Sequence, residues 1–461
     1  EDMLERLTRL KDVDALPRIK MSTPEQFFKE LEDTSNDLCK WIGELYLELH
    51  QGTFTTQAMI KKYNRKLEIL LHDLELTASM AMLANASYKY PQEELSEMWK
   101  KLLLNQFHDV LPGSCIALVV EDALQLYKEV EKVALTALTK ARNSLLSAKQ
   151  STTGTKLLAF NTYSWERTEV VSLPSTVDTT DETPIKKLKT SVSQIRDKQG
   201  KMLAVIHVPS MGYSELKPYE ESLCNVCISD NSNGQIILEN DSLRATIDNV
   251  GRIVSLVHKA SKREAIATGC YGNQFVLYDD VPLFWDAWDV MDYHLETRKP
   301  VTTVKSPAYI VQDSTLSCAI AVSLQISEKS YIEQTISLDA TSKYLKFDTK
   351  VEWNENRKFL KVEIPVTVRS LHASYDIQFG HLQRPTHGNT SWDWARYEVV
   401  GHKWVDLSEY NWGVSVFNDC KYGHCTQNDV IRLSLLKAPK APDPEADMGM
   451  HQFRYAVMPH T

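Results

Sequence analysis

The sequence predicts an α+β protein in which a bundle of long helices is followed by β-sandwich domains. Two observations support this fold class. Apolar residues recur every three or four positions through three long runs between residues 56 and 149, which is the spacing of one face of an α-helix. From residue 156 onward the pattern changes to short runs in which apolar and polar residues alternate, as they do in half-buried strands. Strands and helices do not alternate along the chain, so a barrel of parallel strands is not expected.

Composition narrows the class of function. The 461 residues suffice for two or three domains, and 43% hydrophobic with 25% charged residues is ordinary for a globular protein. The net charge of −9 argues against nucleic acid or an anionic membrane as the main partner. Eight scattered cysteines favour reduced thiols and a cytoplasmic setting. The chain begins with Glu rather than Met, so we expect a piece of a longer protein, and a homo-oligomer remains open.

The first third of the chain is expected to be helical. Residues 1–22 are charged, and a helix should begin at Thr23 and Pro24, where Thr is a preferred cap and Pro suits the first helical position. The segment 38–50 is too apolar for a loop. Long helices are then predicted over 56–85, 91–107 and 115–149, and the short connections between them indicate an antiparallel bundle within a helical domain of residues 23–150.

A compact polar group ends the second long helix. Asn105-Gln106-Phe107-His108-Asp109 is followed by Pro112 and Gly113, which break the helix, and by a Ser that can cap the next one. His108 and Asp109 should therefore lie where two helices meet. A His beside a carboxylate at such a break can bind a metal ion through its imidazole, with the carboxylate turned towards a substrate. The alternative is a His that only bonds to nearby backbone.

The β-rich remainder is expected to form a small domain over 155–232 and a large one over 233–461. Strands are predicted at 157–161, 169–173, 193–196 and 202–208, with a hairpin turn at 197–200 and a polar loop at 176–189. A strand, a turn and a further strand follow within 234–256. Cys224 and Cys227 have no second pair at zinc spacing, so we interpret them as strand residues.

An acidic and aromatic stretch follows at 272–293. Sugar sites use this mixture, because carboxylates bind vicinal hydroxyls and aromatic rings stack on C–H faces. The alternative is a well-packed loop whose carboxylates cap turns. The candidate sugar-binding residues in this stretch are Trp285, Asp286, Trp288 and Asp289.

The segment 103–114 resembles the metal-site segment of the class II α-mannosidases, glycoside hydrolase family 38, in their cytosolic and vacuolar branch. Segments 43–56, 272–293 and 379–398 are similar to the same branch, so the resemblance covers nearly the whole chain. It implies that the last domain is a β-supersandwich of the galactose-mutarotase type. It also implies that residues 1–22 are the tail of an N-terminal catalytic barrel that this sequence does not contain.

The resemblance implies a retaining α-mannosidase that removes α-linked mannose from a mannose-containing oligosaccharide. His108 matches the family's metal-binding His, with zinc or cobalt as the cofactor, and Asp109 matches the Asp that bonds sugar hydroxyls. The nucleophile and the acid/base carboxylate are expected outside this chain, so the isolated chain should be inactive. A cytoplasmic location is expected, with vacuole or lysosome as alternatives.

Two other functions remain open from the sequence. Metal-dependent phosphohydrolases of the His-Asp type also use adjacent His and Asp residues on helices, and His72-Asp73 forms a second such pair. That class leaves the large β region unexplained. The other alternative is a non-catalytic carbohydrate-binding β-sandwich protein with a helical stalk.

Overall fold

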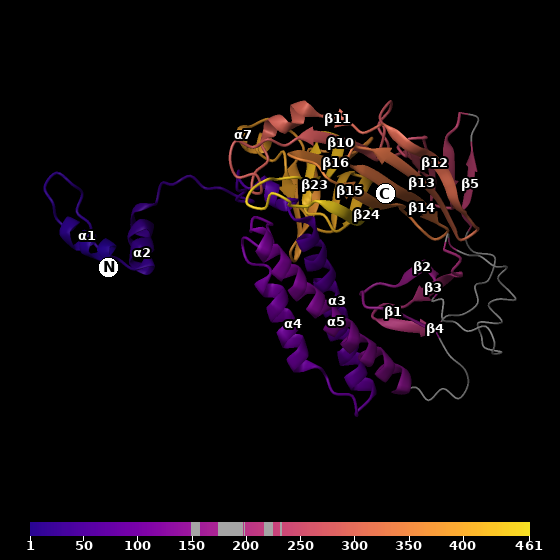
Figure 1. The fold of residues 1–461 in the computed structure, drawn as a ribbon, viewed down its shortest axis with the longest axis horizontal. Coiled ribbons are helices and arrows are strands. Elements are labelled where there is room, and N and C mark those ends of the chain that lie inside the picture. Colours follow the sequence, from indigo (N-terminus) through magenta and orange to yellow (C-terminus); the bar gives the residue numbers. More distant parts are fainter. Residues whose placement is uncertain (149–156, 174–196, 198, 216–224, 231–232) are drawn as a thin grey trace. The chain divides into compact units, whose positions relative to one another are not determined.

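A computed structural model describes residues 1–148, 157–173, 197, 199–215, 225–230 and 233–461 (Figure 1). The chain divides into two compact units, Glu1–Leu47 and Glu48–Thr461. All of the candidate site residues lie in the second unit.

The first unit contains two short helices, α1 (Asp2–Leu10) and α2 (Pro24–Thr34). Helix α2 begins as predicted, because the Thr23 hydroxyl accepts the backbone N–H of Gln26 at 3.3 Å. The expectation that 38–50 is not a loop was wrong, since this segment has neither helix nor strand. Apolar residues recur there at helical spacing (Leu38, Trp41, Ile42, Leu45, Leu49), but Ile42 and Leu45 are 94% and 85% exposed, and an apolar face that is not buried adds little to the stability of a helix.

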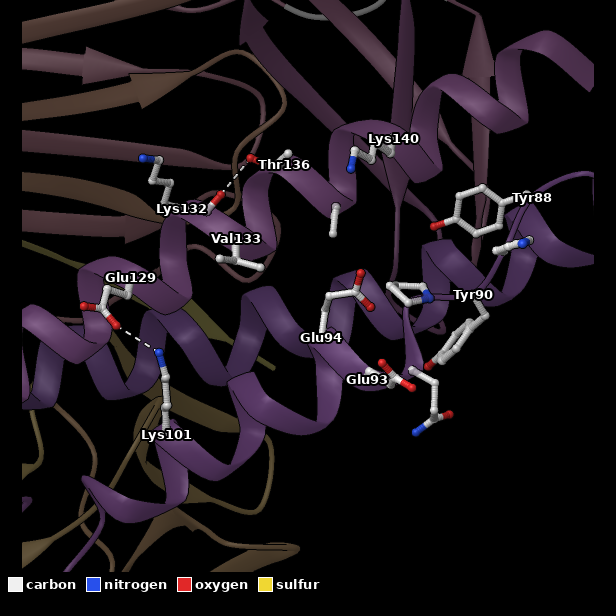
Figure 2. Close-up of a pocket in the computed structure, with 14 residues that line it drawn as sticks. Tyr88, Tyr90, Glu93, Glu94, Lys101, Glu129, Lys132, Val133, Thr136 and Lys140 are labelled. Atoms are coloured by element: carbon white, nitrogen blue, oxygen red, sulfur yellow. Dashed lines mark hydrogen bonds and ion pairs between the residues drawn. The ribbon is translucent and has the colours of Figure 1, made fainter.

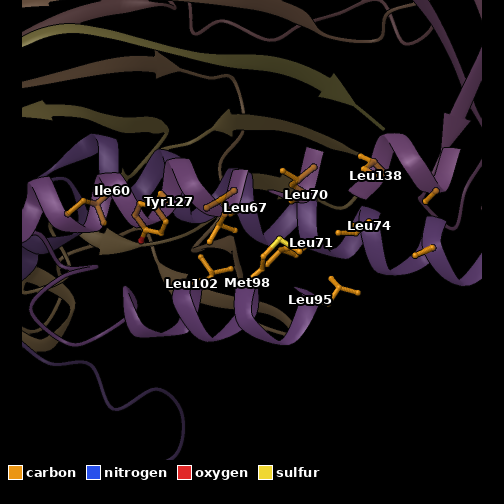
Figure 3. Packing of buried hydrophobic residues seen from close by; sticks show 14 of the residues in the cluster. Ile60, Leu67, Leu70, Leu71, Leu74, Leu95, Met98, Leu102, Tyr127 and Leu138 are labelled. Carbon is orange, nitrogen blue, oxygen red and sulfur yellow. The ribbon is translucent and has the colours of Figure 1, made fainter. Parts of the chain in front are cut away.

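Three long helices form the first part of the second unit and confirm the predicted runs. They are α3 (Ala58–Ala84), α4 (Gln92–Leu104) and α5 (Ala117–Ala148), preceded by the short 3₁₀ helix η1 (Gln51–Phe54). Each long helix contacts the other two. Their facing sides build one apolar core (Figure 3), whose largest members include Leu67, Leu71, Met98, Leu102 and Tyr127.

Two antiparallel strand pairs follow the helices. Strand β1 (Leu158–Asn161) pairs with β4 (Gly212–Glu215), and β2 (Arg167–Ser172) pairs with β3 (Leu203–Val208). These confirm the strands predicted near 157, 169 and 202. The strand expected at 193–196, the loop expected at 176–189 and Cys224 lie outside the described residues.

The remaining strands form three antiparallel sheets. The five-stranded sheet has the order β5-β6-β7-β8-β9, and the nine-stranded sheet has the order β12-β13-β14-β15-β24-β21-β20-β17-β18. The third sheet has six strands in the order β11-β10-β16-β23-β22-β19. The bounds are β5 (Cys227–Asp230), β6 (Ile236–Glu239), β7 (Leu243–Ile247), β8 (Ile253–His258), β9 (Arg263–Glu264), β10 (Gln274–Asp279), β11 (Lys299–Pro300), β12 (Val304–Asp313), β13 (Ser317–Gln325), β14 (Tyr331–Asp339), β15 (Leu345–Trp353), β16 (Lys358–Pro365), β17 (His372–Ile377), β18 (Gly380–Pro385), β19 (Val399–Val400), β20 (Trp404–Glu409), β21 (Trp412–Asp419), β22 (Gly423–Gln427), β23 (Val430–Lys437) and β24 (Gly449–His460).

The nine- and six-stranded sheets pack together as a sandwich. Trp353 at the end of β15 is fully buried, and its indole N–H donates to the carbonyl of Lys437 in β23 at 3.0 Å. Strand β24 lies between β15 and β21, in the interior of the nine-stranded sheet. The connections of the sandwich include the 3₁₀ helix η2 (Asp292–Thr297) and the short helix α7 (Ser391–Trp394). A helical domain followed by β-sandwich domains is therefore the fold class that the sequence predicted.

Candidate functional site

The candidate metal ligand lies in a turn between α4 and α5, here called the His–Asp turn (residues 105–114). Two polar side chains tie the start of this turn to the bundle. Asn105 is buried and donates its amide N–H to the carbonyl of Ala123 at 3.1 Å. Gln106 donates to Asn64 Oδ1 at 3.0 Å and to Glu68 Oε1 at 3.1 Å in α3. The polar group that the sequence singled out therefore begins with two anchors that point inward.

The next residues of the turn point outward. The side chain of His108 is 77% exposed and that of Asp109 is 44% exposed, with His108 Nε2 lying 3.4 Å from Asp109 Oδ2. The ring of Phe107 packs beside the imidazole, with 4.2 Å between the ring centroids. Asp109 Oδ1 accepts a hydrogen bond from the hydroxyl of Ser114 at 3.0 Å, and this bond fixes the orientation of the carboxylate. The arrangement offers an exposed imidazole next to an oriented carboxylate.

The bridging segment (residues 50–57) connects this turn to the aromatic loop (residues 280–291). Gly113 has φ of +80°, and a Cβ placed on it would lie 2.4 Å from the carbonyl oxygen of Thr56. The hydroxyl of Thr56 in turn donates to the carbonyl of Ala287 at 2.9 Å, and the N–H of Gly52 donates to that of Trp288 at 2.7 Å. The His–Asp turn and the aromatic loop, about 180 residues apart in sequence, are thus joined through one short segment.

Within the aromatic loop the two candidate carboxylates already have protein partners. Asp286 is buried and accepts from Arg357 Nε and from the backbone N–H of Lys440, both at 3.2 Å. Asp289 Oδ1 accepts the backbone N–H of His50 at 2.7 Å. These bonds hold the loop in place, which is the role that the alternative interpretation gave the carboxylates. Contact of either residue with a sugar stays a prediction.

The candidate aromatic residues differ in exposure. Trp285 is 65% exposed and has φ of +61°, whereas Trp288 is only partly exposed. Their rings meet edge to face, with 5.5 Å between centroids. Trp285 therefore offers a free ring face of the kind that stacks on a sugar, and Trp288 supports it.

Buried charges lie beneath the aromatic loop. Lys437 is fully buried, lies 2.8 Å from the carboxylate of Asp280 and donates to the carbonyl of Asp289 at 2.9 Å. Burial raises the pKa of Asp280, and the neighbouring ammonium of Lys437 opposes this rise. Removing one partner of a buried ion pair strongly destabilises a protein, because the other charge is left buried without a partner. The pair of Lys437 and Asp280 therefore holds the base of the aromatic loop in place.

The start of α3 is capped from the far end of the chain. Gln57 and Ala58 donate their backbone N–H groups to the two carboxylate oxygens of Asp447, each at 2.7 Å. The amide of Gln57 also donates to Asp443 Oδ2 at 2.8 Å. Sequence reasoning missed this cap, because helix caps are normally sought within a few residues of the helix. Asp443 and Asp447 gave no signal beyond their position in a loop.

The residues present fit part of a metal site. A catalytic zinc ion takes three protein ligands as a rule. Within the described part of the chain, no group of three His, Cys, Asp or Glu side chains is placed to hold a metal ion. The His–Asp turn supplies one imidazole and one carboxylate of the right chemistry and exposure. Any further ligands would have to come from outside the described residues.

The other His-Asp pair is less suited to a metal. His72 Nδ1 lies 3.6 Å from Asp73 Oδ1 on the surface of α3, and that oxygen accepts the hydroxyl of Thr162 at 2.7 Å. Asp73 thus holds the chain that follows the bundle. This contact gives the pair a structural role.

A separate groove of about 800 Å³ opens between α4 and α5 (Figure 2). Tyr88, Tyr90 and Glu94 line it, and the ion pair between Lys101 and Glu129, 2.9 Å apart, lies at one end. Its lining includes no residue of the His–Asp turn or of the aromatic loop. This groove is therefore separate from the candidate site.

Among the helices that the structure describes, none is both long enough and apolar enough to cross a membrane.

The comparisons with known proteins agree with this architecture. Residues 48–145 match the family described as the alpha mannosidase middle domain, and residues 238–445 match the glycosyl hydrolases family 38 C-terminal domain. The chain is 47% identical over its whole length to Alpha-mannosidase 2C1 of Homo sapiens and 38% identical to Alpha-mannosidase of Saccharomyces cerevisiae. It spans 42% and 40% of the lengths of these two proteins.

A solved structure extends the agreement to the fold. The crystal structure of an alpha-mannosidase from Enterococcus faecalis V583 superposes with a TM-score of 0.77 at 16% identity, covering 100% of this chain and 61% of that one. The two matched domains lie in the order in which the helical bundle and the large sandwich occur here. The chain therefore belongs to glycoside hydrolase family 38, of which it carries the middle and C-terminal domains.

Proposed function

We propose that this chain is part of an α-mannosidase that hydrolyses α-linked mannose in oligosaccharides with retention of configuration. The observation that supports this most directly is the His–Asp turn, in which an exposed imidazole and an oriented carboxylate lie side by side. The turn is linked through the bridging segment to an exposed tryptophan. Membership of family 38 supplies the reaction class.

In this proposal His108 is a metal ligand and Asp109 contacts the sugar. The imidazole is exposed, and a neutral imidazole nitrogen is a common ligand of zinc and related ions. Asp109 has one oxygen held by Ser114 and the other turned towards His108, so it can still accept a hydrogen bond from a sugar hydroxyl. Trp285 would stack on the ring, with Trp288, Asp286 and Asp289 holding the loop beside it.

The metal would be zinc or cobalt, bound by His108 together with ligands outside the described residues. When bound, such an ion supplies electrostatic stabilisation at sugar hydroxyls and helps to orient the ring. The retaining reaction also needs a nucleophilic carboxylate and an acid/base carboxylate about 5–5.5 Å apart. We assign neither to this chain.

We further propose that the enzyme works in the cytoplasm. The seven cysteines that the structure describes are all free thiols, which suits a reducing compartment. Its partner would be a mannose-containing oligosaccharide rather than nucleic acid or a membrane, in keeping with the net charge of −9.

The test uses the full-length protein with His108→Ala and, as a matched control, His72→Ala. Both variants remove an exposed His next to an Asp, but only the first lies in the proposed site. His108→Ala should weaken metal binding by roughly 10-fold or more, because even indirect changes at metal sites cost about 10- to 100-fold. Metal content and hydrolysis of an aryl α-mannoside are measured for both variants. Equal metal content and equal turnover in the two would contradict the proposal.

A second variant separates the roles of the two residues. Asp109→Asn should keep the metal and lower kcat/KM by roughly 10- to 150-fold, the equivalent of a lost charged hydrogen bond of about 1.5–3 kcal/mol. Loss of metal comparable to that in His108→Ala would instead make Asp109 a metal ligand.

A further inference from the structure

One buried cation connects the two segments that frame the candidate site. Lys61 lies in the first turn of α3 and is only 2% exposed. Its ammonium group donates to the carbonyl of Thr56 in the bridging segment at 2.5 Å and to the carbonyl of Leu111 in the His–Asp turn at 2.8 Å. The side chain of Lys61 therefore bonds to the backbone of both the bridging segment and the His–Asp turn.

The bond from Lys61 to the carbonyl of Leu111 holds the second half of the His–Asp turn in place. Asn105 and Gln106 anchor the backbone before His108, as described above. After Asp109, Lys61 bonds to the carbonyl of Leu111. His108 and Asp109 thus lie between two anchors, one of which is made by a buried charge from a different helix.

A second lysine provides a natural comparison. Lys421 is also buried, at 6% exposed, and donates to a single carbonyl, that of Leu435, at 2.6 Å. Burial lowers the pKa of Lys61 to about 7 and that of Lys421 to about 8, and the carboxylate of Asp447 opposes this lowering in both. Lys421 differs in that its ammonium bonds to the strand β23 region rather than to the His–Asp turn. The two residues share chemistry and burial but not the connection to the site.

We infer that Lys61 is a positioning residue for the proposed hydrolysis: its ammonium group fixes the distance between the His–Asp turn and the bridging segment. The bridging segment is bonded to the aromatic loop, so this distance also affects the position of His108 relative to that loop. The inference rests on the proposed function for its kinetic consequence. Its structural consequence, the rigidity of the turn, can be measured independently of any activity.

The ammonium group of Lys61 is a hydrogen-bond donor that the two segments share. Removing the ammonium leaves the carbonyls of Thr56, which is buried, and Leu111, which is partly buried, without their shared donor, and a buried polar group without a partner is costly. The backbone can relieve this cost by moving the carbonyl of Leu111 towards water. Such a movement carries Asp109 and His108 with it, because the turn is short. Misplacement of a reacting group by about 1 Å can cost on the order of 100-fold in rate.

The experiment compares Lys61→Met with Lys421→Met in the full-length protein. Each change removes a buried ammonium and keeps an unbranched apolar side chain, so both should lower the melting temperature. Hydrogen exchange of the peptide that covers 107–114 should speed up at least 10-fold in Lys61→Met and stay within about 2-fold in Lys421→Met. Assayed 15 °C below the melting temperature of each variant, kcat/KM on an aryl α-mannoside should fall roughly 10- to 100-fold only in Lys61→Met.

The outcomes distinguish the inference from the proposed function. Unchanged exchange in the turn, or an equal change in both variants, overturns the positioning role of Lys61 whatever the enzyme does. Faster exchange in the turn with unchanged kcat/KM also overturns it, because the turn would then be free to move without consequence. If the wild-type protein has no α-mannosidase activity, the proposed function fails while the exchange result still stands. Should Lys61→Met not fold, Lys61→Gln, a neutral and shorter donor, takes its place in the same comparison.

Discussion

The carboxylate of Asp447 offers a quantitative test of how the helical and β parts of the chain are joined. Its two oxygens accept the N–H groups of Gln57 and Ala58 at 2.7 Å, and its side chain is buried. Asp447→Asn preserves the shape of the side chain but replaces one oxygen by an NH₂ group. One of the two N–H groups at the start of α3 is then left facing a donor.

The magnitude follows from these contacts. A hydrogen bond to a charged group contributes about 1.5–3 kcal/mol, and a negative charge at a helix N-terminus adds about 0.3–1 kcal/mol. One bond is lost, one becomes neutral, and the charge disappears. We therefore expect Asp447→Asn to reduce the local free energy of unfolding by about 2–4 kcal/mol. Asp443→Asn, which removes a carboxylate that bonds to the same glutamine side chain, should cost about 1 kcal/mol.

The assay must report on α3 itself, because a chain of several domains does not unfold in one step. Hydrogen exchange of the peptide that covers the first turn of α3 meets this need. The expected loss corresponds to exchange that is roughly 30- to 900-fold faster in Asp447→Asn. Equal exchange in Asp447→Asn and Asp443→Asn would refute this expectation, since the two backbone bonds to Asp447 would then contribute no more than the single side-chain bond between Gln57 and Asp443.

Three further predictions follow from the same structure. Gly113→Ala should cost about 2–5 kcal/mol in thermal unfolding, because its added methyl group meets a carbonyl oxygen and its φ is positive, whereas Gly234→Ala, with positive φ and open space, should cost only about 1–2 kcal/mol. His294 and His424 are buried, and burial lowers their pKa to about 2 and about 3, so only the unfolded chain binds these protons below pH 6.5. The stability that these two groups contribute should thus be complete above pH 6.5 and fall with decreasing pH, by about 1 kcal/mol per pH unit for each near pH 5, and His294→Phe should lower the slope measured in denaturation series at pH 5 to 7 by that amount. Trp285→Ala should leave the melting temperature unchanged, because the ring is exposed, and should raise KM for an aryl α-mannoside; an unchanged KM would remove Trp285 from the sugar site.

The helices were predictable because their information is local. The three- and four-residue spacing of apolar residues gave α3, α4 and α5 to within a few residues of their ends. The segment 38–50 was mispredicted because helical spacing of apolar residues gives a stable helix only where that face is buried by packing. Ile42 and Leu45 show the difference, being apolar and almost fully exposed.

The candidate site was predictable only where the chemistry is carried by neighbours in sequence. His108 and Asp109 can be recognised in the sequence as an adjacent pair before a helix break. Lys61 and Asp447 cannot be recognised in this way, because one is a lysine on a helix and the other is an aspartate in a loop. Only the fold brings each of them to its partners. The structural partners of Asp286 were hidden for the same reason, since Arg357 follows 71 positions later.

The central place of β24 has a consequence for the order of events during synthesis. Strand β15 begins at Leu345 and β24 at Gly449, so at about 5–20 residues per second roughly 5–20 s separate the two. Until β24 emerges, the nine-stranded sheet exists as two incomplete halves, and both β15 and β21 present an open edge. The nascent sandwich therefore passes through a period in which two long unpaired strands are available to other chains, and a ribosome that stalls before Gly449 leaves the protein in that aggregation-prone state.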